Sequence, residues 1–259
     1  MKKWVLITGA SSGIGLELAK IFAREGWSLV LTARNEDQLK ELAKDFSAHG
    51  TETKIFATDL GNKESCEDIF KWVQRENIFI HILVNNAGFG RNEFFGDTSL
   101  PEQLDMIELN ISALTHLTHL FLQPMLKRHE GKILNVASTA AFQPGPFMSV
   151  YYASKAFVYS FSYALAEEMA DQGIVVTALC PGPTTTNFQK RAGRFHSEKM
   201  IKFWTMSAVE VAETGFKGLM NGKRVVIPGW LNKTAYVFSK LLPVKILAKA
   251  AGKVVRGKT

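Results

Sequence analysis

Short apolar runs alternate with longer segments of mixed polarity along most of the chain. The runs are rich in leucine and β-branched residues and have the length of buried strands; they cover residues 4–8, 28–33, 53–59, 80–88, 132–138, 174–182 and 224–229. Between them, apolar residues recur three and four positions apart, as in 15–26 and 36–50, which indicates amphipathic helices. Gly26 and Gly50 stand where helices commonly end in a glycine, so both segments have a predicted end.

This alternation of strands and helices predicts an α/β fold. Right-handed crossovers between consecutive strands would give a doubly wound, seven-stranded and mostly parallel sheet with helices on both faces, as in a Rossmann fold. Two of the helices, over about 101–128 and 149–171, are expected to be long. With 46% apolar residues and no linker rich in proline, glycine or serine, the chain is expected to form a single domain over 1–259. Ligands of such sheets bind beyond the carboxyl ends of the strands, so the chemistry should follow each run.

A glycine-rich turn follows the first run and opens the first helix. Gly9, Gly13 and Gly15 have the spacing G-x-x-x-G-x-G. Such a turn lets backbone N–H groups approach a pyrophosphate, and the helix N-terminus adds a favourable positive potential. The turn therefore predicts a dinucleotide site at the end of the first strand.

The second and third runs end in residues that bear on the choice of cofactor. A site that prefers NAD usually has a carboxylate after the second strand to hold the ribose 2′-hydroxyl, but here Arg34 stands at that place. Its guanidinium can form charge-assisted hydrogen bonds to a 2′-phosphate. A role for Arg34 in binding NADP(H) is therefore favoured over the alternative that it is a solvated arginine at a helix start. Asp59, which ends the third run, either accepts a hydrogen bond from the adenine amino group or caps the following helix before Asn62.

Six motifs follow one another at the expected strand ends. They are TGASSGIG (8–15), NNAG (85–88), Asn110 in LNIS, Ser138 in NVASTA, YYASK (151–155) and PGPTTT (181–186). Each motif alone is weak, but the ordered set resembles that of the short-chain dehydrogenases/reductases. The resemblance runs from residue 8 to about 186, and the strand and helix pattern continues to about 229.

The resemblance implies an NADP(H)-dependent oxidoreductase that passes a hydride between the nicotinamide and a carbonyl or secondary alcohol. The implied catalytic residues are Ser138, Tyr151 and Lys155, with Asn110 holding a water that links the lysine to solvent. Lys155 would also bind the nicotinamide ribose, and Thr184 and Thr186 would bond the carboxamide. The cofactor is expected to contact Gly9, Ser11, Ser12, Gly13, Ile14, Gly15, Arg34, Asp59, Leu60, Asn86, Ala87, Gly88, Lys155, Pro181, Gly182, Thr184 and Thr186.

The spacing of Tyr151 and Lys155 supports a role in proton transfer. Residues four apart share one face of a helix. An ammonium about 4 Å from a phenol interacts with it by roughly 4 kcal/mol at an effective dielectric of about 20. Before desolvation subtracts from this effect, it would lower the tyrosine pKa from about 10 towards 7. Such a phenol can donate its proton to a developing alkoxide, and the Ser138 hydroxyl can stabilise the same charge. Tyr152 and Thr139 are neighbouring competitors; the Y-x-x-x-K and N-x-x-S spacings favour Tyr151 and Ser138.

Two aromatic segments are expected to form the substrate walls. Residues 188–204, which include Phe195, Phe203 and Trp204, are interpreted as a lid, because loops at these strand ends commonly carry function. The turn 142–147 is expected to line the opposite wall. These aromatic residues suggest an apolar, lipid-like substrate, although packing of the lid on the core explains them equally well.

The net charge of +7 comes from the end of the chain. Ten of the 31 basic residues follow Glu213, and no acidic residue does, so the preceding chain has a slightly negative balance. Residues 230–259 predict a C-terminal extension of two short amphipathic helices, rich in lysine and broken at Pro243. Either this tail rests on anionic lipid as a peripheral membrane contact, or it packs over the active-site mouth or another subunit. Because the charge lies on an apolar tail, a nucleic-acid partner is not expected.

Other features of the sequence set the expected surroundings. The apolar run after the first lysines is too short for an export signal, and Cys66 and Cys180 are expected to be free, buried thiols, which points to the cytoplasm. Six scattered histidines form no metal-ligand pattern, so no metal is expected. The resemblance implies a homodimer or homotetramer. Two alternatives stay open: a 3-oxoacyl-carrier-protein reductase, and a module that senses NADP(H) without turnover.

Overall fold

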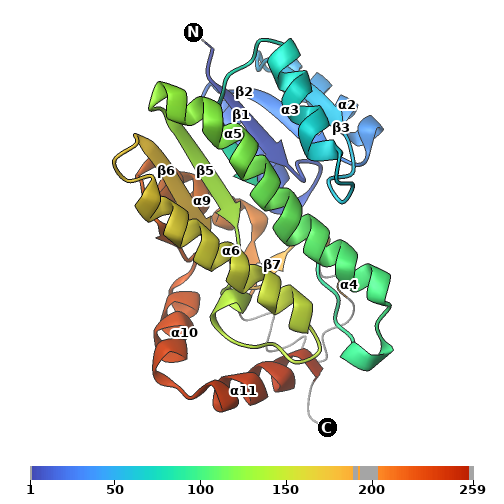
Figure 1. Cartoon of the computed structure of the whole chain (residues 1–259), viewed down its shortest axis with the longest axis vertical. Helices are drawn as coiled ribbons and strands as arrows, with labels where there is room; N and C mark the ends of the chain where they lie inside the picture. Colours follow the sequence, from blue (N-terminus) through green and yellow to red (C-terminus); the bar gives the residue numbers. More distant parts are fainter. Residues whose placement is uncertain (1, 189–191, 193–203, 257–259) are drawn as a thin grey trace.

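A seven-stranded parallel sheet forms the centre of the computed structural model, which describes residues 2–188, 192 and 204–256 (Figure 1). Its strands run in the order β3-β2-β1-β4-β5-β6-β9, and every neighbouring pair is parallel. Their bounds are β1 (Trp4–Thr8), β2 (Ser28–Ala33), β3 (Thr53–Ala57), β4 (Ile80–Asn85), β5 (Gly131–Val136), β6 (Ile174–Leu179) and β9 (Val225–Val226). The predicted doubly wound fold is confirmed, and the strand order reverses between β1 and β4, where such sheets bind ligands.

Helices cover both faces of this sheet (Figure 1). Along β1, Val5 and Ile7 point to one face, where they pack with α1, α2 and α9, while Trp4 and Leu6 point to the other, with α3, α5 and α6. Burial on both faces explains why the strands are continuous apolar runs rather than alternating ones. The helices are α1 (Gly13–Arg24), α2 (Glu36–Ala48), α3 (Ser65–Arg75), α4 (Leu100–Ile107), α5 (Leu114–Arg128), α6 (Ser149–Glu168), α9 (Ala208–Met220), α10 (Trp230–Leu241) and α11 (Val244–Arg256).

Several predicted strands extend too far at their carboxyl ends. The run 80–88 leaves the sheet after Asn85, 174–182 leaves it after Leu179, and 224–229 contributes only two residues. The backbone at these points turns into the loops that surround the site, although the residues remain apolar or small. Four short elements lie in such loops: η1 (Phe95–Asp97), η3 (Thr139–Phe142), β7 (Thr184–Thr185) and β8 (Met206–Ser207).

The long helix predicted over 101–128 is interrupted. A π-helical turn, η2 (Glu108–Ala113), separates α4 from α5 and contains Asn110. The amide side chain of Asn110 bonds Phe89 and Ser154, and a wider turn accommodates it while the helix axis continues. Such turns are rare and are frequently found at functional sites.

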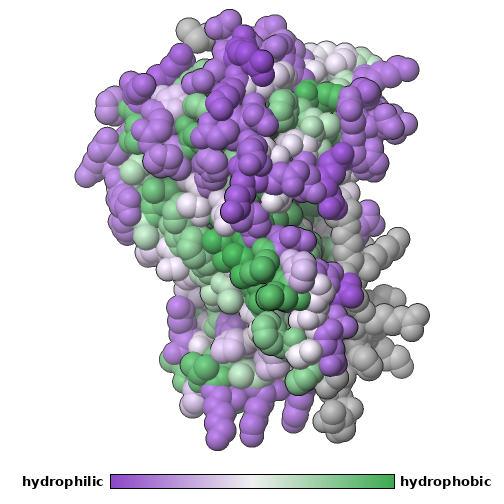
Figure 2. All heavy atoms as spheres, turned by 45° about the vertical axis from the view of Figure 1, so that its right-hand side comes forward, coloured by the Kyte–Doolittle hydropathy of each residue, from purple (hydrophilic) through white to green (hydrophobic). Residues whose placement is uncertain are grey.

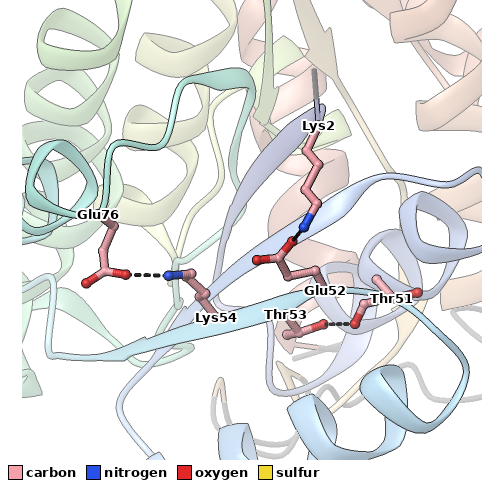
Figure 3. A network of polar contacts seen from close by, with 6 residues as sticks. All are labelled: Lys2, Thr51, Glu52, Thr53, Lys54 and Glu76. Atoms are coloured by element: carbon pink, nitrogen blue, oxygen red, sulfur yellow. Dashed lines mark hydrogen bonds and ion pairs between the residues drawn. The ribbon is translucent and has the colours of Figure 1, made fainter.

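Charged side chains protect the sheet at the edge formed by β3, near the amino ends of the strands (Figure 3). Lys54 on β3 forms an ion pair with Glu76, and Lys2 ahead of β1 pairs with Glu52 ahead of β3. The Thr53 hydroxyl donates to the carbonyl of Thr51 at 3.3 Å. A charged edge strand discourages pairing with another chain. These contacts lie at the end of the sheet opposite to the carboxyl ends, where ligands are expected.

The C-terminal extension forms two helices, α10 and α11, that meet at Pro243, as predicted (Figure 1). Tyr236 of α10 packs against Phe142, with ring centroids 4.5 Å apart, and its hydroxyl lies 3.4 Å from that of Tyr159 on α6. The face of α11 that carries Leu247, Ala251 and Val255 is buried. One face of the tail therefore packs on the body of the protein, as the packing interpretation expects. Among the described residues, none of the helices has both the length and the apolar character needed to cross a bilayer.

Candidate functional site

The carboxyl ends of the strands surround one cleft of about 920 Å³. Most of the predicted site residues line it: Gly9, Ser11, Ser12, Gly13, Ile14, Arg34, Asp59, Leu60, Asn86, Ala87, Gly88, Ser138, Tyr151, Lys155, Pro181, Gly182, Thr184 and Thr186. Gly15 and Asn110 do not line the cleft and act from behind its wall. The strand ends thus bring together residues that are up to 177 positions apart, Gly9 and Thr186 being the outermost.

The glycine turn between β1 and α1 depends on backbone conformations that favour glycine. Gly9 and Gly13 have φ values of +63° and +58°, in the left-handed region. A side chain at Gly15 would collide with the carbonyl of Gly9 and with the Asn86 amide. Gly15 therefore allows α1 to lie directly against the turn, rather than touching a ligand in the cleft as the sequence suggested. The N-terminus of α1 faces the cleft, and the Ser12 side chain makes no capping hydrogen bond there.

Thr8 and Asn86 lock this turn to the end of β4. The Thr8 hydroxyl accepts hydrogen bonds from the backbone N–H groups of Asn86 and Ala87, both at 2.9 Å. The Asn86 side chain donates to the carbonyl oxygens of Thr8 at 2.9 Å and Gly9 at 3.2 Å. Asn86 thus shapes the cofactor turn from below. Thr8 was missed as a site residue, although it is the first letter of the glycine motif.

Arg34 and Asp59 face each other at the outer end of the cleft. Their side chains are 61% and 45% exposed, and an Arg34 guanidinium nitrogen lies 3.8 Å from an Asp59 oxygen. Asp59 does not cap α3, which begins at Ser65; instead it accepts a hydrogen bond from the backbone N–H of Gly61 at 3.0 Å. The helix-cap interpretation of Asp59 is therefore wrong. Arg34 is held by an exposed pair that water screens, so its guanidinium is available to a stronger anion.

Ser138, Tyr151 and Lys155 meet at the inner end of the cleft. Ser138 follows β5, and its hydroxyl donates to the carbonyl of Pro181 at 3.3 Å and accepts from the Ala140 N–H at 3.1 Å. Lys155 is buried, lies 5.8 Å from the centre of the Tyr151 ring, and donates to the Val136 carbonyl at 2.8 Å. The two motifs after β5 and on α6 therefore form one cluster.

The electrostatics of this cluster differ from the expectation. Burial raises the pKa of Tyr151 to about 12, and a hydrogen bond with Ser138 only partly opposes this effect. Burial lowers the pKa of Lys155 to about 8. The expected decrease of the tyrosine pKa towards 7 is wrong for this structure, because desolvation, which was expected only to reduce that decrease, is the largest effect on the buried phenol. Tyr151 is instead a neutral phenol at neutral pH, with a proton to give.

Geometry also separates the two tyrosines. Ser138 acts against burial on the pKa of Tyr151, whereas the ring of Tyr152 lies over Gly145, where a side chain would collide with it. Both line the cleft, and burial raises the pKa of Tyr152 as well. Thr139 uses its backbone N–H to bond the Pro181 carbonyl at 2.8 Å. The arrangement favours Ser138 and Tyr151 over their neighbours.

Asn110 connects the wall of the cleft to α6. Its side chain accepts from the Phe89 N–H at 3.1 Å and donates to the Phe89 carbonyl at 2.9 Å and to the Ser154 hydroxyl at 3.1 Å. Ser154 in turn donates to the carbonyl of Tyr151 at 2.7 Å. These bonds fix the loop after β4 against the turn of α6 that carries the tyrosine. The role of Asn110 as the holder of a water stays a prediction.

The substrate walls agree only in part with the sequence interpretation. Gln143 and Phe188 line the cleft, and the Phe188 ring packs against Tyr151 with centroids 5.2 Å apart. Phe142 instead points to α10, and Trp204 is 37% exposed and is not part of the cleft lining. Phe195 and Phe203, the other aromatic residues of the expected lid, lie outside the described residues.

Sequence reasoning missed several lining residues. Val254 and Val255, from α11, close one side of the cleft, and Glu102 and Asp105 approach from α4. Only the amphipathic pattern of the tail could have indicated the first pair, since nothing local in 254–255 suggests a site. The cleft thus has an apolar wall built by the last helix of the chain.

Comparisons with known proteins agree with this geometry. The family model described as short chain dehydrogenase matches residues 3–197. A very-long-chain 3-oxoacyl-CoA reductase of Anas platyrhynchos is 36% identical over 192 residues, which is 72% of this chain and 61% of that protein. A 17-beta-hydroxysteroid dehydrogenase type 3 of Mus musculus is 38% identical over 208 residues, 78% of this chain and 65% of that protein. This chain therefore spans less than two thirds of both relatives.

A solved structure is similar over almost its whole length. The short-chain dehydrogenase from Sphingobium yanoikuyae in complex with NADPH is 31% identical and has a TM-score of 0.82, with 93% of this chain and 96% of that chain covered. The fold, the ordered motifs and the matched family model agree with one another. The chain belongs to the short chain dehydrogenase family.

Proposed function

We propose that this protein is an NADP(H)-dependent oxidoreductase that transfers a hydride between the nicotinamide and a carbonyl or secondary alcohol. One observation carries the proposal: the glycine turn and the Ser138–Tyr151–Lys155 cluster open on the same cleft. A dinucleotide site and a proton-transfer group are the two parts that such a reaction needs.

The cleft fits a dinucleotide phosphate cofactor. The left-handed Gly9 and Gly13 leave backbone room at the N-terminus of α1, where a pyrophosphate is favoured. Arg34, at the outer end, is the group that would hold a 2′-phosphate, and no carboxylate of β2 competes for a ribose hydroxyl. The structurally similar Sphingobium protein was solved with NADPH. The remaining predicted contacts, from Leu60 to Thr186, line the same cleft and belong to this proposal.

The chain's own residues supply the proton chemistry. NADP(H), when bound, provides or accepts the hydride. In the direction of reduction, Tyr151 donates its phenolic proton to the substrate oxygen while Ser138 donates a hydrogen bond to the same oxygen. Lys155, charged below its pKa of about 8, stabilises the negative charge that then develops on Tyr151. The high pKa of Tyr151 keeps its proton in place until the substrate oxygen becomes basic.

The preferred substrate is an apolar ketone or alcohol. Met148, Phe188, Val254 and Val255 give the inner cleft an apolar lining. The two relatives are named for a very-long-chain 3-oxoacyl-CoA and for a hydroxysteroid, each of which has a large apolar part. A carrier-bound 3-oxoacyl chain is a narrower variant of the same class.

We also propose that the enzyme acts in the cytoplasm as a homodimer or homotetramer. Large apolar side chains are exposed on α4 and α6, among them Leu100, Leu104, Ile107, Phe157 and Tyr163. A broad hydrophobic area lies in the middle of the face shown in Figure 2, at the level of these helices. Contiguous apolar surface of this kind commonly marks a contact between proteins.

The decisive experiment follows the oxidation of NADPH or NADH by absorbance with short, long-chain, cyclic and acyl-thioester ketones. We expect turnover with NADPH and an apolar ketone, and a decrease of about 10²–10⁴-fold in Tyr151→Phe. Tyr152→Phe is the matched control and should retain activity. NADPH binding without turnover of any ketone would favour the sensing module. A preference for NADH would contradict the assignment of Arg34.

A further inference from the structure

A stripe of large apolar side chains on α10 faces outward. Trp230, Val237, Phe238 and Leu241 are 70%, 56%, 61% and 74% exposed. Their spacing of three, four and seven places them along one side of the helix. Val244 and Ile246, at 63% and 52% exposure, continue the apolar surface past Pro243 into α11. Exposed apolar residues gathered in this way mark a surface for interaction rather than scattered surface positions. We call these six residues the tail stripe.

The lysines of the tail border this stripe. Lys233 and Lys240 lie on α10, and Lys245, Lys249 and Lys253 on α11, and all five are exposed. No acidic residue follows Glu213 in the sequence. At the lower end of Figure 2, below the level of α6, long hydrophilic side chains project beside hydrophobic atoms, and this is where α10 and α11 lie in Figure 1. An apolar stripe that is bordered by lysines, without acidic residues, is complementary to an anionic lipid surface.

The opposite side of α10 is fixed to the body of the protein. Asn232 is buried, donates to the Pro228 carbonyl at 2.8 Å, and lies directly against Gly182 in the loop after β6. Tyr236 packs on Phe142 and contacts Tyr159. The tail stripe therefore cannot turn inward without breaking these contacts, and it stays presented to the outside.

The second tail helix connects this outer surface to the cleft. The first turn of α11 carries exposed Val244 and Ile246, whereas Val254 and Val255 near its end line the cleft. Gly252 lies against Pro146 and Phe147, in the turn on the substrate side. A single helix thus runs from the tail stripe to the apolar wall of the active site.

We infer that the tail stripe docks on an anionic lipid surface, so that the cleft takes its apolar substrate from that surface along α11. The inference rests on the proposed function for its second half only, since docking needs no turnover. A second copy of this chain is a poorer occupant of the stripe. A two-fold contact is self-complementary, and it would bring the same lysines of both copies together without any acidic partner in the tail.

Co-sedimentation of the full-length protein tests the docking half. We expect binding to vesicles of phosphatidylcholine mixed with phosphatidylglycerol, little binding to phosphatidylcholine alone, and release as salt rises. Phe238→Asp with Leu241→Asp should decrease binding at least about tenfold, because two charges enter the apolar contact. Lys233→Glu with Lys240→Glu should decrease it for anionic vesicles, while Lys40→Glu with Lys44→Glu on α2 makes the same change of charge away from the stripe and should leave it unaltered.

Turnover with two ketones tests the delivery half. A poorly soluble ketone carried in the anionic vesicles should be reduced several-fold faster by the parent protein than by Phe238→Asp/Leu241→Asp. A small, water-soluble ketone should be reduced at the same rate by both, which also shows that the variant is folded. Equal rates with the vesicle-borne ketone would overturn delivery.

Two results would overturn docking itself. The first is parent protein that stays in the supernatant with anionic vesicles at low salt. The second is a stripe variant that binds vesicles like the parent while sedimentation velocity shows a loss of oligomers, which would make the stripe a protein contact. Because these readouts do not depend on NADPH oxidation, a failure of the proposed reaction leaves them interpretable.

Discussion

The two ends of the cleft are built in different ways. The cofactor end is made by short local segments, namely the turn from Gly9 to Gly15 and the residues that follow β2 and β4. The substrate end is assembled from distant pieces: η3, α6, Phe188 and the last turns of α11. A pyrophosphate is recognised by backbone geometry, which a short motif encodes, whereas an apolar substrate is recognised by a shape that only tertiary packing creates. The cofactor end can therefore be predicted from the sequence, whereas the substrate end is the place where this chain can differ from its relatives.

The Ser138–Tyr151–Lys155 cluster lies between these two ends. Of the single substitutions that distinguish the ends, Ser138→Ala should have the largest effect. Removal of a hydroxyl that donates to the developing oxyanion costs about 10²–10³ in kcat in comparable sites. We expect that decrease in the rate of ketone reduction, with NADPH affinity unchanged, because the cofactor end is not touched. Steady-state kinetics and NADPH fluorescence titration measure the two quantities. Thr139→Ala is the matched control; an equal loss in Thr139→Ala would mean that the wrong hydroxyl has been assigned.

Arg34→Ala should have the next largest effect, and this effect should be confined to the cofactor end of the cleft. Hydrogen bonds to a charged group contribute about 1.5–3 kcal/mol, which corresponds to about a 10- to 100-fold increase in the KM for NADPH. The KM for NADH and the kcat for the ketone should change little, because Arg34 lies at the outer end of the cleft, beside Asp59. A similar loss for both cofactors would show that Arg34 supports the fold of the loop rather than a 2′-phosphate.

The pH profile tests the electrostatics of the centre. Lys155 is charged below its pKa of about 8 and neutral above it, while Tyr151, with a pKa of about 12, keeps its proton across this range. Ketone reduction should therefore be fastest below about pH 8 and decrease by about tenfold for each further pH unit until another step limits the rate. Initial rates at saturating NADPH from pH 6 to 10 measure this.

Lys155→Arg provides the comparison for that profile. An arginine stays charged throughout the range, so its lower rate should be independent of pH above 8. A parent profile that is flat to pH 10 would contradict a role for the lysine charge.

The parts of the fold and the site that could be predicted from the sequence are those that depend on local patterns, as at the cofactor end of the cleft. The doubly wound parallel sheet and the glycine turn were predictable, because each depends on local patterns along the chain, and the resemblance to a family implied the meeting of Ser138 with Tyr151 and Lys155. The π-helical turn at Asn110 was not, since helical periodicity hardly changes over one wider turn. The direction of the Tyr151 pKa was missed because it depends on burial, which spacing does not reveal. Packing of the tail over the active-site mouth was one of the interpretations offered by the sequence, but the lining residues Val254 and Val255 were missed, because their place depends on packing between residues more than a hundred positions apart.

Val254→Ala should have the smallest effect. It tests whether the wall that α11 adds to the substrate end of the cleft contacts a large substrate. Val254 is partly buried and lines the cleft, so loss of its two methyl groups removes about 1 kcal/mol of apolar contact from a large substrate. We expect kcat/KM for a bulky ketone to decrease about fivefold, with no change for a small ketone or for NADPH. Lys253→Ala, at the exposed neighbouring position, is the control for a general loosening of α11. Equal losses for small and bulky ketones would show that the substitution acts through the stability of α11. In that case α11 would not be the wall that contacts the substrate, and another part of the substrate end would have to distinguish the ketones.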